Sequence, residues 1–127
     1  MTPAGFRKLA LSLPEATEQS HMRHPDFRVL KRVFATLGYP DDGFGMVALT
    51  PLQQSQFVAA HPAVFSLAKG AWGARGATLV LLKAATASSL RPALFEAWRN
   101  VAPPSRVATN GPRTTRRTSR KLKSRVR

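Results

Sequence analysis

The sequence predicts an α+β fold in which one antiparallel sheet carries helices on one face. Apolar residues recur at helical spacing in three segments, while residues 17–49 alternate with a period of two. The connections between the alternating segments are short, as in an antiparallel meander. We therefore expect the order α-β-β-β-β-α-β-β-α within residues 1–104, followed by a tail over residues 105–127.

Two of the helices have clear start and stop signals. The first is expected over residues 3–12, because Thr2 can cap it, a proline occupies the first helical position, and Pro14 ends it. The second begins after Thr50, where Gln53 has the spacing of a capping box, and a His-Pro pair ends it.

A third helix is predicted from an apolar face near residue 100. The face consists of Leu90, Leu94, Trp98 and Val101. These side chains are expected in the core. Ser88 or Ser89 is the expected cap, and Pro92 is tolerable only if the helix starts close before it.

Alternation and short apolar runs predict six strands. The expected ranges are 18–22, 26–30, 33–38, 45–49, 65–69 and 78–82. In the third strand, Phe34 and Thr36 are expected on the face opposite to Ala35. Residues 70–76 are expected to form a glycine-spaced loop, in which Trp72 folds back onto the core.

The positive charge is concentrated at the C-terminal end of the chain. The net charge is +14, and residues 105–127 hold nine of the 20 lysines and arginines but none of the six acids. Such a segment must meet solvent or a polyanion, and we expect it to be disordered in isolation. We interpret it as an arm that binds phosphates; about five to eight contacts would give a slope of log K against log salt of about −5 to −7. An anionic membrane surface and a merely solubilising tail are the alternatives.

The composition argues against several other classes of protein. Cysteine is absent, the three histidines are not spaced for a metal, and the acids are few and scattered. No apolar run is long enough to span a bilayer and no secretory signal is apparent, so a cytoplasmic location is expected. The glycines match no nucleotide-binding signature, and no nucleophile stands beside an oriented base. We therefore expect no enzymatic activity, no metal site and no cofactor.

Seven short segments resemble the MmcQ/YjbR-like family in their order and spacing. They are LSLPEA (11–16), HPDFRV (24–29), VFATL (33–37), LTP (49–51), PAVF (62–65), GAWG (70–73) and AWR (97–99). The resemblance covers residues 6–104 and implies a compact α+β domain, similar to frataxin-like proteins and secretion chaperones. It also implies DNA binding through a double-wing surface of paired hairpins, and it supplies no catalytic residues.

Two positions depart from the family pattern. The tip of the first hairpin reads Leu30-Lys31-Arg32, where small, glycine-rich residues are usual in the family. A two-residue turn needs a positive φ that Leu and Lys resist, so the turn is expected to be longer or of another type. Ala77 stands where the family often has an aromatic residue, which removes one potential stacking surface.

These features together predict a nucleic-acid interface, with DNA favoured over RNA. Hairpin tips at residues 28–32 and 69–76 would contact backbone phosphates, and the tail would add affinity without sequence choice. The expected binding residues are Arg28, Lys31, Arg32, Lys69, Arg75, Arg113, Arg116, Arg117, Arg120, Lys121, Lys123, Arg125 and Arg127. We expect a monomer or weak dimer. The alternative function is a chaperone-like domain that binds a protein or a small molecule, with the tail as an accessory.

Overall fold

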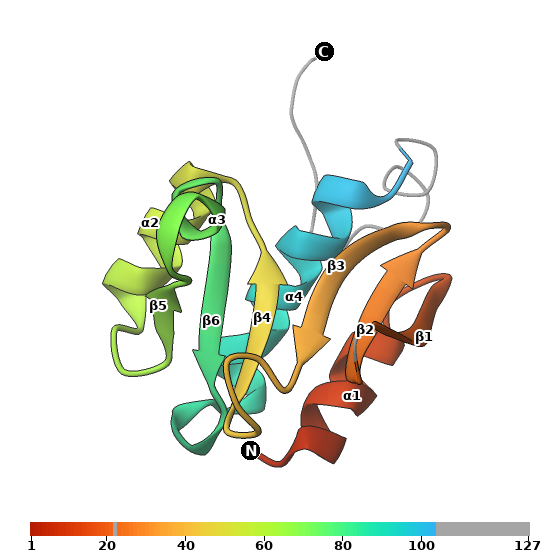
Figure 1. Cartoon of the computed structure of the whole chain (residues 1–127). Helices are drawn as coiled ribbons and strands as arrows, with labels where there is room; N and C mark the ends of the chain where they lie inside the picture. The colour runs from red at the N-terminus through yellow and green to blue at the C-terminus, as the bar shows by residue number, and fades with distance from the viewer. Residues whose placement is uncertain (22, 104–127) are drawn as a thin grey trace, which may run out of the picture.

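The computed structural model describes residues 1–21 and 23–103 (Figure 1). The elements of these residues are, in chain order, α1 (Pro3–Leu11), β1 (Ala16–His21), β2 (His24–Val29), β3 (Arg32–Leu37), β4 (Phe44–Ala48), α2 (Pro51–Ala60), β5 (Phe65–Leu67), α3 (Gly70–Ala74), β6 (Ala77–Leu81), a 3-10 turn (Leu82–Ala84) and α4 (Ala87–Val101). All the predicted strands and helices are present, and the additional helix α3 replaces the predicted loop. The predicted tail lies outside the described residues.

The strands form one six-stranded sheet in the order β1-β2-β3-β4-β6-β5. Every neighbouring pair is antiparallel. The first four strands follow one another as a meander, and β6 then pairs with β4 on one side and with β5 on the other. The predicted α+β fold with an antiparallel sheet is therefore confirmed.

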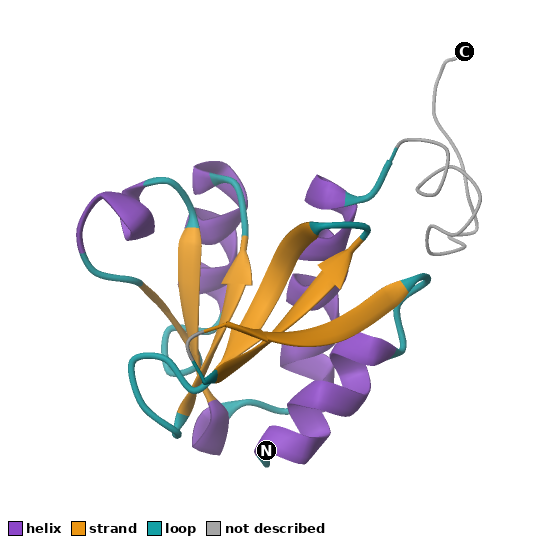
Figure 2. Ribbon diagram, turned by 45° about the vertical axis from the view of Figure 1, so that its right-hand side comes forward, coloured by secondary structure: helices purple, strands orange, loops and turns teal. Residues whose placement is uncertain are grey.

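Helices α1, α2 and α4 cover one face of this sheet and enclose the core (Figure 2). The largest core side chains are less than 2% exposed and belong to Phe6, Phe27, Phe34, Phe65, Leu90, Leu94 and Trp98. The Trp98 indole nitrogen donates to the carbonyl of Pro14 at 2.9 Å, which fixes α4 against the end of α1. The opposite face, termed here the open face, is not covered by these three helices.

The helix starts follow the predicted caps, except at α4. The Thr2 hydroxyl caps α1, and Thr50 and Gln53 form the expected capping box of α2. The cap of α4 is Thr86, whose hydroxyl accepts from the backbone N–H of Ser89 at 3.1 Å. The Ser89 hydroxyl in turn accepts from the backbone N–H of Thr86 at 3.0 Å. The prediction of Ser88 or Ser89 as the cap is therefore wrong, because Ser89 is the second member of a capping box.

A bulge in β3 changes which side chains face the core. Phe27 pairs with Ala35 and Arg28 pairs with Val33, so Phe34 is an extra residue on β3. Phe34 and Ala35 are both fully buried as a result. The predicted placement of Phe34 on the face opposite to Ala35 is wrong, since simple alternation does not hold across a bulge.

The β2–β3 hairpin has a two-residue connection despite its sequence. Val29 pairs with Arg32, which leaves only Leu30 and Lys31 in the turn. Leu30 adopts a positive φ of 59°, and its side chain is 62% exposed. A side chain in this left-handed region costs roughly 1–2 kcal/mol. Of the two expected alternatives, the longer turn is therefore wrong, and a strained leucine adopts the positive φ for which glycine is usual.

Helix α3 is held against α2 and β6 by side-chain hydrogen bonds and by close packing of the backbone. The buried Gln54 side chain of α2 donates to the carbonyls of Gly73 at 3.0 Å and Ala77 at 3.1 Å. A Cβ at Gly73 would lie 1.7 Å from the carbonyl oxygen of Ala68, so only glycine fits there. Gly76 turns the chain into β6 with a φ of +115°.

In the described part of the chain, no helix has the length and apolarity needed to cross a bilayer.

Candidate functional site

Two of the predicted basic segments lie at the same end of the sheet, on either side of β3 and β4 (Figure 1). Antiparallel pairing places the β2–β3 hairpin, the end of β4 and the start of β6 at this end. Helix α4 also finishes here, since the Asn100 amide donates to the carbonyl of Ala48 at 3.2 Å. This surface, termed the basic end, is defined by four exposed residues: Lys31, Arg32, Lys69 and Arg75.

The cations of the basic end form no ion pairs within the described residues. None of its four residues takes part in the ion pairs found among residues 1–21 and 23–103. The exposed acids Asp41 and Asp42 lie in the β3–β4 connection, at the opposite end of β3. Each end carries charges of both signs, since the exposed Glu15 precedes β1 beside the hairpin tip and the exposed Lys83 follows β6 at the opposite end. What distinguishes the four cations of the basic end is the absence of ion pairs with other described residues, which leaves them available to anions.

Two residues of the hairpin tip differ in their surroundings. The Arg32 guanidinium approaches the carbonyl of Val101 at the end of α4, with a nitrogen–oxygen distance of 3.5 Å. A cation in this position complements the carbonyl end of a helix dipole. Lys31 is exposed beside Leu30 at the turn. Both cations remain accessible from solvent, although Arg32 also has a structural contact.

Arg28 lies below the tip, where an acid balances its charge. Its Nε and one Nη donate to the two carboxylate oxygens of Asp26 at 2.7 and 3.0 Å. The Asp26 side chain is only 3% exposed and that of Arg28 is 22% exposed. The hydrogen bonds to Asp26 raise the pKa of the Arg28 guanidinium above its usual value. Arg28 therefore differs from the other predicted binding residues of this hairpin, because an acid partner already balances its charge.

Helix α3 presents an aromatic side chain between two cations. Lys69 precedes its first residue and Arg75 follows its last, and both are exposed. Trp72 is 44% exposed, and its ring meets the ring of Tyr39 edge-on with centroids 5.4 Å apart. The expectation that Trp72 folds back onto the core is wrong, because the short helix directs it over the open face.

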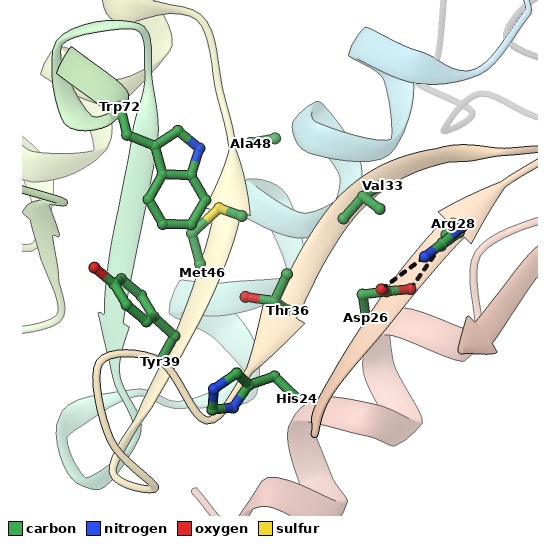
Figure 3. A pocket seen from close by; sticks show the side chains of 9 residues that line it. All are labelled: His24, Asp26, Arg28, Val33, Thr36, Tyr39, Met46, Ala48 and Trp72. Carbon is green, nitrogen blue, oxygen red and sulfur yellow. Dashed lines mark hydrogen bonds and ion pairs between the residues drawn. The ribbon is translucent and has the colours of Figure 1, made fainter. Parts of the chain in front are cut away.

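A groove lies on the open face and was not predicted from the sequence (Figure 3). Its volume is about 630 Å³, and it is lined by His24, Asp26, Arg28, Val33, Thr36, Tyr39, Met46, Ala48 and Trp72. Trp72 and Tyr39 stand on one side, the Asp26–Arg28 pair stands on the other, and Thr36 lies between them. The lining is mostly apolar with few polar groups, which is typical of ligand-binding sites.

One polar atom of the groove has no partner. The Thr36 hydroxyl oxygen is shielded from solvent and forms no hydrogen bond within the described residues. A buried hydroxyl in this state destabilises the folded protein by about 1–3 kcal/mol.

A sequence signal for the groove does exist. His24, Asp26 and Arg28 are spaced by two residues in one strand, so their side chains share a face. The contributions of Tyr39 and Trp72 could not be found in this way, because a loop and an unexpected helix supply them.

The remaining predicted binding residues lie outside the described residues. They are Arg113, Arg116, Arg117, Arg120, Lys121, Lys123, Arg125 and Arg127. The described chain ends at residue 103, just beyond α4 and hence at the basic end. Over the described ranges, no group of three or more His, Asp or Glu side chains is placed to hold a metal ion.

Comparisons with known proteins agree with this fold. The chain is similar over 87% of its length to a crystal structure of Deinococcus radiodurans protein DR2400, described as a DUF419 domain. The two chains are 18% identical, the TM-score is 0.67, and 88% of the other chain is covered. The search of curated proteins returned no match. A model of the YjbR family matches residues 11–100, so the chain belongs to the YjbR family.

Proposed function

We propose that this protein binds nucleic acid, with DNA favoured over RNA, through contacts between the basic end and backbone phosphates. The observation that carries the proposal is the position of Lys31, Arg32, Lys69 and Arg75 at one end of the sheet without ion pairs among the described residues. Nine more lysines and arginines follow in residues 105–127. Phosphate neutralisation by such cations releases counterions and supplies most of the affinity of non-specific binding.

We propose that this binding has little sequence preference. The cations of the basic end are placed at the ends of strands and at a short helix, where they can reach phosphates. Phosphate contacts position a protein on nucleic acid but do not read bases.

We also propose that the protein is not an enzyme. His24 and Asp26 both line the groove, which is the arrangement that a catalytic base and its orienting carboxylate would need. However, both oxygens of Asp26 accept from Arg28, and none of the described hydrogen bonds joins Asp26 to His24. The carboxylate is therefore engaged in an ion pair rather than in orienting the imidazole.

The test is the salt dependence of binding to a labelled 20-base-pair DNA duplex by the full chain. Lys69→Gln with Arg75→Gln removes two cations from the basic end. If both contact phosphates, the slope of log K against log salt becomes shallower by about 2. The matched control is Lys83→Gln with Arg91→Gln, two exposed cations near the opposite end of the sheet. It removes the same charge and should leave the slope nearly unchanged.

Equal changes in the two double variants would contradict a localised interface and would indicate only a response to net charge. The absence of any association between the full chain and DNA at low salt would refute the proposed function itself.

The groove favours a second candidate, the binding of a small molecule. Its volume of about 630 Å³ falls within the range of about 300–1,000 Å³ that is typical of such sites. A screen of uncharged compounds by thermal shift distinguishes the two functions. A compound that raises the melting temperature equally at low and high salt would support the second candidate, because its binding would not depend on phosphate neutralisation.

A further inference from the structure

We propose that the groove on the open face holds an unpaired nucleobase, so that the protein prefers single-stranded nucleic acid to a duplex. The inference rests on the proposed function and adds a substrate class to it. The basic end would hold the phosphates, and the groove would hold a base of the same strand.

The first argument is the position of the aromatic side chains. Trp72 and Tyr39 are 44% and 38% exposed and form one side of the groove. Aromatic rings that stack on bases, combined with cations that follow the backbone, are the usual means of binding single strands. Helix α3 combines both features, because Lys69 and Arg75 flank Trp72 in a segment of seven residues.

The second argument is the charge of the groove. Arg28 is the groove's permanent cation, and its two hydrogen bonds to Asp26 balance that charge locally. The centre between Trp72 and this ion pair is formed by apolar side chains such as Met46 and Ala48. A phosphate would gain little in such a place, whereas a planar and uncharged ring suits it.

The third argument is the unused hydrogen-bonding capacity. A guanidinium has five N–H donors, and Arg28 directs only two of its nitrogens to Asp26. A nucleobase carries acceptors on its edge, so it can accept from the N–H groups of Arg28 that Asp26 does not use. An aliphatic ligand offers no acceptor to them.

A duplex cannot offer its bases in this way. Its bases are paired and stacked, and a base enters a pocket only after extrusion from the helix. A single strand avoids that unfavourable step. The proposal therefore predicts weaker binding of a duplex than of a single strand of the same length.

Tryptophan fluorescence provides a direct test with the full chain. Trp72 lines the groove, while the second tryptophan, Trp98, is fully buried in the core. We expect a twelve-nucleotide oligothymidylate to quench the emission of Trp72, and an abasic strand with the same number of phosphates to bind without quenching. Thymidine monophosphate tests a free nucleotide as the ligand, and we expect it to bind much more weakly than the strand.

Three variants separate stacking from folding. We expect Trp72→Leu to weaken binding of the oligothymidylate at least about fivefold and to leave binding of the abasic strand unchanged. Trp72→Phe retains a ring and should recover most of the affinity. Leu11→Ala removes an apolar side chain of similar exposure (38%) from α1 and should have no effect.

Equal affinities of the full chain for oligothymidylate, abasic strand and duplex would overturn the inference while leaving phosphate binding intact. A monophosphate that binds as tightly as the strand would also overturn it, in favour of a free nucleotide. If none of these polyanions bound, the proposed function would fail first.

Discussion

The unpaired hydroxyl of Thr36 leads to a prediction that runs against the usual effect of substitutions in a sheet. Thr36→Val replaces the hydroxyl by a methyl group of nearly the same shape. Because the oxygen is shielded from solvent and has no partner within the described residues, nothing is lost except its desolvation cost. That cost is about 1–3 kcal/mol, so we expect the free energy of unfolding to rise by about 1 kcal/mol.

A second threonine of the same sheet provides a matched control. The hydroxyl of Thr78 donates to the carbonyl of Gly76 at 2.8 Å and accepts from the side chain of Gln54 at 3.1 Å. Thr78 is fully buried, so Thr78→Val removes two buried hydrogen bonds, which contribute about 0.5–1.5 kcal/mol each. We expect it to lower the free energy of unfolding by about 1–3 kcal/mol. The same chemical change should thus have opposite signs at two positions.

Equilibrium unfolding in urea, followed by far-ultraviolet circular dichroism, measures both effects. Thermal unfolding offers a second measurement: for about 100 folded residues, a change of 1 kcal/mol in the free energy of unfolding shifts the melting temperature by about 4–8 °C. The slope of the free energy against urea should stay the same in both variants, since the surface exposed on unfolding does not change. A loss of stability in Thr36→Val comparable to that in Thr78→Val would refute the reasoning, because it would mean that the Thr36 hydroxyl has a partner.

Three further substitutions, one of them with a matched control, test the fold. Gly76→Ala would place a Cβ 1.8 Å from a backbone oxygen at a φ of +115°, so we expect the free energy of unfolding to fall by more than about 3 kcal/mol. Gly70→Ala is the control, because Gly70 has a φ of +68° but lies in open space, and it should lower the free energy of unfolding by about 1 kcal/mol. Urea unfolding measures both, and equal losses would rule out the collision. Thr86→Ala removes the capping box of α4 and should cost about 1 kcal/mol, with faster amide exchange confined to the first turn of that helix. Unchanged amide exchange in the first turn of α4 would argue against capping by Thr86. Trp98→Phe leaves a cavity in the core and removes the donor to the Pro14 carbonyl, so we expect the free energy of unfolding, measured by thermal unfolding, to fall by about 2–4 kcal/mol. A fall of less than about 0.5 kcal/mol would be inconsistent with the burial of Trp98.

The elements with strong local signals could be predicted from the sequence. Capping residues and prolines marked the starts of α1 and α2, and period-two alternation marked β1 to β4. Helix α3 could not be predicted, because five residues with two glycines show neither a helical period nor good helix propensity. Its position depends on contacts from Gln54, which lies about 20 residues earlier in the sequence.

The site was predictable only in part. The cations of the basic end could be identified from their positions in two turns, and the structure adds that both turns lie at the same end of the sheet. The pairing of Arg28 with Asp26 could have been anticipated from their spacing of two residues in a strand. The groove could not, because the bulge at Phe34 and the placement of Trp72 depend on tertiary packing.

The contact between Trp98 and Pro14 joins residues that are 84 positions apart. During synthesis the later residue emerges roughly 4–17 s after the earlier one, at about 5–20 residues per second. Until then β3 and β4 lack the helix that packs against them in the folded protein. Completion of the core is therefore a late event in biosynthesis, because it must await the residues that form the last helix.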